Sequence, residues 1–595
     1  MLGMVKRFLI TTALEETWSE KEPVLFLGDW CQRYSRRGRW SKMDAEVLPY
    51  HWDDRKQLYS DYQYLIEFYE RLLVNLSAQL NQIHGVNHSL RYWRILIGPW
   101  LGIFTQMLFD RWTSIQLAIS RYDLSGTIVL ADQEESLIPD DMNSFSSFFG
   151  DDEWNHHLYA AIIQQFTAVP CVKQVRPKRD SALKTASSDS WKRKVKRTIA
   201  ECYSRVASLL TRDHDAFFLN TYLQRLDEIR LCRRLREVPK FWPLVSTVRS
   251  AVNINQRQWL VAGESHSEFE TCAHTLIPQQ IPTAYLEGYN QLIKQSNGMP
   301  WPKQPKVIWT SNAHIGNDVF KAWTAGKVEC GSPLVIGQHG GHYGIGHWSF
   351  VEDHELAASD CYLSWGWSEP DQPKVYPVGQ LTAKRPLGVH HAEQKRAVMV
   401  TTVVPRYSYT MRSFMVSGQW QDFFNDQCTF VLNLPAYIRK ELTVRLHSKS
   451  YGWNQAARWK DNFPDISLNE GKTNINDLIL KSRLYISTYN ATTYLESFAM
   501  NVPTVIFWNP NHWELRDSAI PYFENLKSVG IFHETPESAA RHVAAIWDDV
   551  DSWWTSLDVQ KAVKSFKERY CRTDNMLDRL EVILKAQIAE GGSLA

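Results

Sequence analysis

Hydrophobic residues along the chain form two kinds of pattern, short apolar runs and longer stretches with helical spacing. Apolar residues recur every three or four positions at about 54–81, 92–122 and 154–166, which predicts helices. Short apolar runs bounded by turn residues predict strands between them. These strands are Val24–Leu27, Thr127–Ala131, Trp259–Ala262, Val307–Thr310, Leu334–Gly337 and Cys361–Trp365. Strands that alternate with helices indicate an α/β fold.

The same alternation starts again at Ala397–Val404 and ends in three predicted helices after residue 537. A polar stretch, Leu381–Glu393, separates the two series and is typical of a linker. We therefore predict two Rossmann-like domains that face a cleft. The first spans 1–385, with helical insertions at about 54–250. The second spans 394–595 and includes the closing helices.

The composition of the chain bears on its binding partners and on the cellular compartment in which it works. The 595 residues carry 66 Lys and Arg against 65 Asp and Glu, so net charge does not favour a nucleic-acid partner. Nine scattered cysteines without a CxxC pair favour a reducing compartment. No secretory signal pattern is visible. The apolar stretch Ile95–Phe109 is shorter than the roughly 20 residues that span a bilayer. We expect a cytoplasmic protein with a buried helix at this stretch.

One segment, 171–197, is basic, rich in serine and poor in large aliphatic residues. These features predict an exposed, solvated loop. The alternative is that its lysines and arginines meet anionic lipid headgroups or a lipid-linked acceptor. That alternative would make the protein peripheral at the inner membrane.

The loop Gln338–Gly346 (QHGGHYGIG) directly follows a predicted strand. Glycine destabilises a fold unless the backbone needs unusual dihedral angles or close approach to a ligand. Four glycines around His339 and His342 therefore favour a functional loop over a flexible turn. A metal site is disfavoured, because the two histidines lack a third ligand at a typical spacing.

A second stretch, Ser482–Pro510, predicts a strand, a polar loop, a helix and another strand. Glu496 lies one turn into the helix. The loop and the helix N-terminus are expected at the carboxyl end of a parallel sheet, where free N–H groups suit a phosphate. The alternative is an ordinary crossover that binds nothing.

An activated sugar nucleotide needs cations or N–H groups at its phosphates and a carboxylate at its ribose. The second half of the chain offers candidates for both at predicted strand ends. They are Arg445, His447, Ser487, Thr488, Asn490, Thr492, Thr493 and Glu496. Transfer also needs a base or a nucleophile. The carboxylate candidates are Asp29, Asp318, Glu352 and Glu355, each with a structural role as the alternative.

Four blocks together resemble a known group of enzymes. They are QHGGHYG at 338–344, DCYLSWGW at 360–367, RLHSKSYGW at 445–453 and STYNATTYLE at 487–496. They look like the signature blocks of transferases from bacterial O-antigen and capsule clusters, with the GT-B glycosyltransferase fold. At a distance the chain is similar to capsule transferases that use CMP-Kdo or other CMP-activated ulosonic acids, and to polyol-phosphate polymerases. In the Kdo enzymes a proline follows the histidine; here Ser448 follows His447.

The resemblance implies roles for particular residues. Glu496 would hold the donor ribose, while Arg445, His447 and the 487–493 loop would hold its phosphate. His339 would face the cleft from the other domain as a catalytic residue, beside Gln338, Gly340 and Gly341 in the nucleotide-sugar site. GT-B enzymes usually need no bound metal, and the nucleotide sugar is a substrate, so no cofactor is expected.

These observations together predict a metal-independent glycosyltransferase. It would move a CMP-activated ulosonic or nonulosonic acid onto a surface polysaccharide, such as lipopolysaccharide O-antigen or capsule, or onto a lipid-linked acceptor. One alternative is a transferase of glycerol or ribitol phosphate from a CDP-polyol. A non-enzymatic alternative is a component of polysaccharide export or a scaffold.

Overall fold

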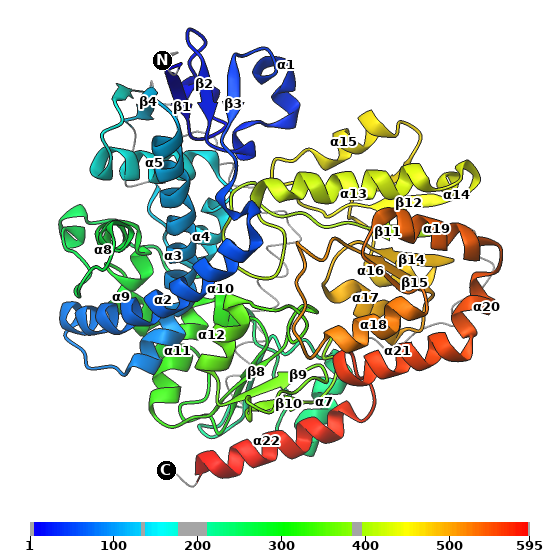
Figure 1. Ribbon diagram of the computed structural model, residues 1–595. Coiled ribbons are helices and arrows are strands. Elements are labelled where there is room, and N and C mark those ends of the chain that lie inside the picture. Colours follow the sequence, from blue (N-terminus) through cyan, green and yellow to red (C-terminus); the bar gives the residue numbers. More distant parts are fainter. Residues whose placement is uncertain (1–4, 132–136, 176–210, 383–395, 593–595) are drawn as a thin grey trace, which may run out of the picture.

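The structure, a computed structural model, describes residues 5–131, 137–175, 211–382 and 396–592. Most of the basic segment 171–197 and most of the predicted linker lie outside these residues. Within them, all paired strands of the sheets are parallel, and helices connect most of them (Figure 1). The chain is thus an α/β protein with three parallel sheets, as the strand and helix patterns predict.

The first sheet has the order β3-β2-β1-β4-β5. Its strands are β1 (Arg7–Ile10), β2 (Val24–Phe26), β3 (Ala45–Val47), β4 (Leu124–Leu130) and β5 (Cys171–Gln174). The second sheet has the order β10-β9-β8-β7-β6. Its strands are β6 (Phe217–Leu219), β7 (Ile308–Thr310), β8 (Leu334–Gly337), β9 (Cys361–Ser364) and β10 (Val375–Pro377). Residues 1–385, which we expected to form one domain, therefore contain two separate sheets.

The third sheet has the order β13-β12-β11-β14-β15-β16. Its strands are β11 (Ala397–Val400), β12 (Leu442–Arg445), β13 (Ser467–Asn469), β14 (Leu484–Ser487), β15 (Thr504–Phe507) and β16 (Phe532–His533). The predicted strand at Trp259–Ala262 is wrong. This stretch is irregular, and the N–H of Val261 donates to the carbonyl of His274 instead of to a neighbouring strand.

Two long helices separate the first sheet from the second. They are α2 (Arg55–His84) and α3 (Leu90–Arg121), and α3 packs against α5 (Asp152–Phe166), α11 (Asp318–Glu329) and α12 (Phe350–Ala358). The apolar stretch Ile95–Phe109 lies within α3 and is almost entirely buried, which confirms the predicted buried helix. Among the described residues, no helix combines the length and the hydropathy needed to cross a membrane.

Helices cover the third sheet on two sides. Figure 1 shows its strands between α13 (Trp420–Asn433) with α19 (Pro536–Ile546) and the group α17 (Thr492–Ala499), α18 (Ile520–Ser528) and α21 (Leu557–Tyr570). The last helix, α22 (Met576–Gly592), returns to the second sheet and packs on α7 (Arg225–Arg234). The chain therefore crosses back and ties the second and third sheets together.

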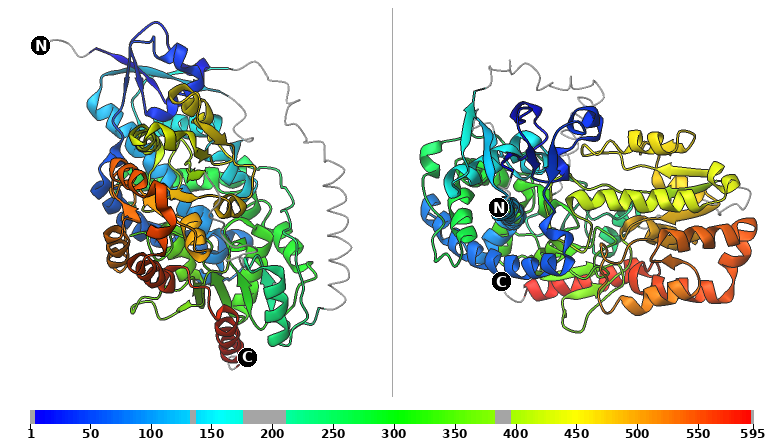
Figure 2. Two further views of the ribbon diagram at one scale, coloured as in Figure 1. Left: turned by 90° about the vertical axis from the view of Figure 1, so that its right-hand side faces the viewer. Right: turned by 45° about the horizontal axis from the view of Figure 1, so that its top comes forward.

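The first and third sheets also meet directly. The right-hand view of Figure 2 shows the blue elements of the first sheet beside the yellow elements of the third. At this contact the Tyr34 hydroxyl donates to Asp461 of α15 (Gln455–Asn462) at 2.7 Å. Arg37, in α1 (Arg37–Trp40), forms an ion pair with the same carboxylate at 2.9 Å.

An irregular segment, Thr401–Gln419, joins β11 to α13 and lies between all three sheets. Almost all of its residues are buried. Apart from the short 3-10 helix η8 (Ser417–Gln419), the segment forms neither a helix nor a sheet, so its buried backbone needs other hydrogen-bond partners. Here the partners come from other parts of the chain. The carbonyl of Ser408 accepts from Arg111 (2.6 Å), the N–H of Met411 donates to Gln106 (2.6 Å), and the N–H of Ser413 donates to the carbonyl of Trp348 (3.0 Å).

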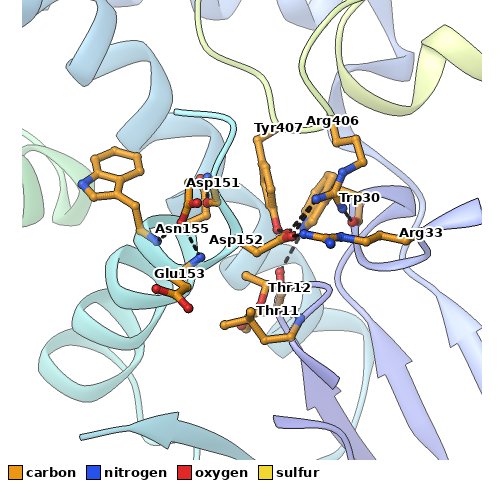
Figure 3. Close-up of polar contacts among 12 residues, drawn as sticks. Thr11, Thr12, Trp30, Arg33, Asp151, Asp152, Glu153, Asn155, Arg406 and Tyr407 are labelled. Carbon is orange, nitrogen blue, oxygen red and sulfur yellow. Dashed lines mark hydrogen bonds and ion pairs between the residues drawn. The ribbon is translucent and has the colours of Figure 1, made fainter. Parts of the chain in front are cut away.

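The same segment is fastened to the first sheet by a buried ion pair (Figure 3). Asp152, the first residue of α5, accepts two hydrogen bonds from Arg406 at 2.7 and 2.9 Å and others from Tyr407 and Arg33. The side chains of Asp152 and Arg406 are only 3% and 2% exposed. Burial alone would raise the pKa of Asp152, but Arg406 and Arg33 lower it below its usual value. Arg406 also donates to the carbonyl of Trp30, so this contact holds two loops of the first sheet.

Replacing Asp152 by alanine should lower the free energy of unfolding by about 3 kcal/mol, because Arg406 would keep a buried charge without its partner. The matched control is Asp461→Ala, since Asp461 joins the same two sheets but is 44% exposed. Exposed ion pairs contribute about 0–1 kcal/mol. Chemical denaturation followed by tryptophan fluorescence measures both variants. Equal losses would contradict the importance of the buried pair.

Candidate functional site

The predicted loop Gln338–Gly346 touches the third sheet's domain at the predicted phosphate-binding helix. The N–H of Gly341 donates to the hydroxyl of Thr492, the first residue of α17, at 3.1 Å. A Cβ atom on Gly341 would lie 2.6 Å from the backbone of Ala491, so only glycine permits this approach. The structure thus brings together two stretches about 150 positions apart, and the loop that carries His339 contacts the first turn of the helix that carries Glu496.

The end of this loop makes a second contact with the third sheet's domain, at residues 514–516. Gly346 pairs with Leu515 in an antiparallel bridge. The N–H of His347 donates to the carbonyl of Glu514, and the N–H of Arg516 donates to the carbonyl of Ile345. Backbone hydrogen bonds therefore hold this side of the loop against the third sheet's domain.

His339 is held by a buried carboxylate. Its Nδ1 lies 3.2 Å from Oε1 of Glu355 in α12, and Nε2 of His314 lies 3.0 Å from the same oxygen. Burial alone would raise the pKa of Glu355, but His339 and His314 more than offset it and lower the pKa to about 2. An ionised carboxylate at this distance attracts a proton on Nδ1, although the contact lacks hydrogen-bond geometry. Nε2 lies 3.2 Å from the hydroxyl of Tyr343.

Glu352 stabilises the conformation of the loop. One of its carboxylate oxygens accepts from the N–H of Gly344 at 2.9 Å, and the other pairs with Arg516 at 2.5 Å. Gly344 has φ of +71°, a left-handed conformation that favours glycine. Burial raises the pKa of Glu352, and Arg516 partly offsets the effect. This carboxylate therefore links the loop to the third sheet's domain.

Gln338 is also used inside the loop. Its amide nitrogen donates to the carbonyl of Gly340 at 2.8 Å, and its amide oxygen accepts from the N–H of Trp365 (2.8 Å) and the indole of Trp367 (2.9 Å). Gln338 is 1% exposed. Its side chain therefore fixes the start of the loop, whereas His339 and His342 are partly exposed.

The predicted phosphate loop after β14 divides into buried and accessible residues. Ser487 donates to the carbonyl of Tyr489, Thr488 donates to the carbonyl of Val400, and Asn490 accepts from the hydroxyl of Tyr494. All three predicted ligands, Ser487, Thr488 and Asn490, are at most 1% exposed. In this structure they support the shape of the loop.

Thr492, Thr493 and Glu496 are the partly exposed members of the predicted set. They lie in the first turns of α17. Thr493 shares hydrogen bonds with the hydroxyls of Tyr485 (2.6 Å) and Tyr489 (3.1 Å). The carboxylate of Glu496 is near enough to Tyr489 to help raise the pKa of that phenol, after the larger effect of burial.

Arg445 is the last residue of β12, and His447 lies two positions after it. The Arg445 guanidinium donates to Asn469 and to the carbonyl of Thr473, both at 2.9 Å. Nδ1 of His447 accepts from the N–H of Lys449 at 3.1 Å, and burial lowers the pKa of His447. Within the described part of the chain, no carboxylate forms an ion pair with Arg445 or Lys449.

Sequence reasoning missed Arg412, which lies in the buried Thr401–Gln419 segment. Its guanidinium is half-buried, lies 4.2 Å from the ring centroid of Phe414, and has no carboxylate partner among the described residues. It acts electrostatically on His342 of the loop and on Tyr451. The His447 ring stacks on Tyr451 at 6.3 Å, so Arg412 and His447 lie on the same side of the third sheet.

Two predicted carboxylates lie elsewhere. Asp29 follows β2 of the first sheet, which Figure 1 places far from β8, and a Cβ on Gly418 would touch it. Burial and Asp53 raise the pKa of Asp29. Asp318 is buried against Lys321 and the hydroxyl of Tyr285, each at 2.6 Å. The structure therefore does not bring Asp29 to the His339 loop, and it gives Asp318 a packing role.

Clustered metal ligands do not occur in the described part of the chain. Across residues 5–131, 137–175, 211–382 and 396–592, no group of three or more His, Cys, Asp or Glu side chains is arranged to hold a metal ion. The chemical groups that the site does offer are its cations, its hydroxyls and the His339–Glu355 pair.

The family follows from a comparison of the sequence with known protein families. The chain matches the sequence profile of the LIC12162 family transferase over residues 7–582. It belongs to this family of transferases. No curated protein matches this chain in a sequence comparison.

Solved structures similar to this LIC12162 family transferase include three proteins. A mutant of TarM from S. aureus has 12% identity and a TM-score of 0.32, and the match covers 47% of this chain and 55% of TarM. The wall teichoic acid polymerase TagF has 9% identity and a TM-score of 0.30, with coverage of 67% and 97%. The glycosyltransferase SnogD from Streptomyces nogalater has 12% identity and a TM-score of 0.34, with coverage of 63% and 99%. The match thus spans about half the length of TarM.

Replacing Glu355 by glutamine should make stability less sensitive to acid. The pKa of Glu355 is lowered from 4.5 to about 2, so its contribution is fully present above pH 4.5 and is lost as the pH falls toward 2. The difference in free energy of unfolding between wild type and variant should shrink by about 2 kcal/mol from pH 6 to pH 3. Urea denaturation at the two pH values measures this difference. A difference that stays constant would contradict the ion pairing of Glu355.

Proposed function

We propose that this transferase moves a glycosyl group from a nucleotide-activated donor to a hydroxyl group of the acceptor, as GT-B glycosyltransferases do. The observation that carries the proposal is the contact of the His339 loop with the first turn of α17. This contact puts the backbone of the loop that carries His339 against the first residue of α17. Arg412 and Arg445 belong to the same domain as that helix. A base and a phosphate-binding surface at one place are what such a transfer requires.

The donor side is proposed to lie at the carboxyl ends of β11, β12 and β14. Arg412 and Arg445 carry positive charge there without an ion-pair partner in the described residues, and they would bind the donor phosphates. Thr492 and Thr493 begin α17, whose N-terminal N–H groups favour negative charge. Glu496, one turn further, would accept hydrogen bonds from the donor ribose.

His339 is proposed as the general base. Its Nε2 would take the proton of the acceptor hydroxyl as that oxygen bonds to the anomeric carbon. The bond from this carbon to the donor phosphate breaks at the same time, and the electron pair leaves with the phosphate, whose charge the cations stabilise. Glu355 would hold the imidazole in place and stabilise the imidazolium that forms.

The burial of the carboxylates supports a direct displacement. Both oxygens of Glu352 are engaged by Gly344 and Arg516, and Glu355 is fully buried. Neither is placed to form a covalent glycosyl intermediate, which would need an accessible carboxylate. A single displacement inverts the anomeric configuration. We therefore propose an inverting reaction.

The finer identity of the substrates rests on the sequence blocks. We propose a CMP-activated ulosonic or nonulosonic acid as the donor and a surface polysaccharide or lipid-linked acceptor, handled on the cytoplasmic face of the inner membrane. A CDP-polyol is the second candidate, because the His339–Glu355 pair and the same cations could serve attack at phosphorus. Incubation with CMP-sugars, CDP-polyols and UDP- and GDP-sugars, with the released nucleotide measured, separates the two. Consumption of none of these donors would contradict the proposal.

Replacing His339 by alanine should leave nucleotide affinity unchanged and lower turnover at least about 100-fold, because a general base contributes that much or more. The control is His266→Ala, since His266 is exposed and distant in sequence from the loop. Calorimetry with the nucleotide and a steady-state assay with the donor measure the two properties. Unchanged turnover in His339→Ala would remove His339 from the reaction.

Replacing Glu496 by alanine should weaken nucleotide binding about tenfold, because a charged hydrogen bond to the ribose would be lost. Glu524→Ala is the matched control, since Glu524 is an exposed helical glutamate of the same domain. Titration calorimetry gives both affinities. Equal affinity in wild type and Glu496→Ala would exclude the ribose role.

A further inference from the structure

A separate pocket opens at the same edge of the second sheet as the His339 loop. It has a volume of about 220 Å³ and lies at the carboxyl ends of β6 and β7. Four of its lining residues carry amide side chains, and no charged side chain lines it among the described residues. The amide residues are Asn143, Asn220, Asn312 and Asn317. The pocket is therefore neutral and rich in paired donors and acceptors.

The backbone beside this pocket is in a costly conformation. Asn220 has φ of +53° and Tyr222 has φ of +66°, both in the left-handed region. A bulky residue such as tyrosine rarely adopts this conformation, and such strain persists only where the surroundings enforce it. Ser311 holds the turn in this conformation. Its N–H donates to the carbonyl of Asn220 (3.0 Å), and its hydroxyl donates to the carbonyl of Thr221 (3.1 Å).

This conformation connects the pocket to the proposed base. The amide nitrogen of Asn312 donates to the hydroxyl of Tyr222 at 2.6 Å. The centroid of the Tyr222 ring lies 6.5 Å from that of the His339 ring. The strained turn thus places one side chain between the amide pocket and the histidine.

The four asparagine side chains differ in how many hydrogen bonds they already form within the protein. Asn317 caps α11 by accepting from the N–H of Phe320 and donates to the carbonyl of Val245. Asn312 lines the pocket and donates one hydrogen bond to Tyr222, and no described residue donates a hydrogen bond to its amide oxygen. Asn143 and Asn220 are exposed at the rim. The side chains of Asn143 and Asn220 and the amide oxygen of Asn312 are therefore available to hydrogen-bond a ligand.

We propose that this pocket binds a neutral sugar unit of the acceptor, with Asn312 and Tyr222 as positioning residues that direct an acceptor hydroxyl toward His339. The inference rests on the proposed function and specifies its acceptor. Amide side chains offer a donor and an acceptor side by side, which matches neighbouring hydroxyls of a sugar ring. The volume is below the roughly 300–1,000 Å³ of pockets for drug-sized ligands, so it suits one sugar unit.

Charge separates this pocket from the donor site. Arg412 and Arg445, which have no ion-pair partner among the described residues, belong to the third sheet's domain. The pocket is lined by described residues between 143 and 317, and none of these carries a charge. An anionic phosphate or acidic sugar would gain nothing here from ion pairing. A neutral pyranoside is therefore the class of ligand that the lining fits.

Saturation-transfer NMR tests the pocket without the transfer reaction. The probes are the methyl glycosides of glucose, galactose and N-acetylglucosamine, with glucuronic acid as the charged comparison. We expect saturation of at least one neutral glycoside, reduced at least fivefold in Asn312→Ala and in Asn220→Gly, which keeps the left-handed backbone. Asn433→Ala, an exposed asparagine of α13, is the matched control. No saturation in wild type, equal saturation in Asn312→Ala, or stronger saturation of glucuronic acid would overturn the proposal.

A kinetic test addresses the positioning role. Tyr222→Phe should raise the KM for a neutral acceptor at least fivefold, without a comparable rise in the KM for the donor. An unchanged KM for the acceptor, or an equal rise in both KM values, would overturn the role of Tyr222. If the wild type consumes no nucleotide donor yet binds a neutral glycoside through Asn312, the proposed function fails and the sugar pocket stands.

Discussion

The buried ion pair between Asp152 and Arg406 constrains the whole molecule. Arg406 lies in an irregular segment that finds many of its hydrogen bonds outside itself, and these partners come from the first sheet, from α3 and from the loop before α12. Breaking a buried pair leaves an uncompensated charge and is costly. The segment therefore contacts all three sheets, and it adds to the backbone hydrogen bonds between residues 345–347 and 514–516 that hold the third sheet's domain against the second.

The candidate site depends on this arrangement. The His339 loop belongs to the second sheet, and α17 belongs to the third, so their contact through Gly341 and Thr492 exists only while the two sheets keep their places. The same segment that carries Arg406 also carries Arg412, which adds a cation on the side of His342. One stretch of chain thus both fastens the sheets and contributes charge to the space between them.

Much of this was visible in the sequence, for physical reasons that also set its limits. The strand before the His339 loop begins and ends at the predicted residues, Leu334–Gly337, because a short buried run between turns has few alternatives. The division of residues 1–385 into two sheets was not predicted, since periodicity does not say which strands pair. Arg406 and Arg412 were missed as contacts because their partners lie far away in the sequence. Ser487, Thr488 and Asn490 were predicted as ligands, but a polar loop uses hydroxyls and amides equally well to satisfy its own backbone.

Hydrogen exchange measured with and without a bound nucleotide tests the central claim most directly, that the His339 loop and the start of α17 border one site. CMP, CDP, UDP and GDP are the probes, and a thermal shift selects the one that binds. The account predicts slower exchange in both 338–346 and 487–496 when the nucleotide is bound. Slower exchange confined to the first sheet, with both segments unchanged, would contradict it.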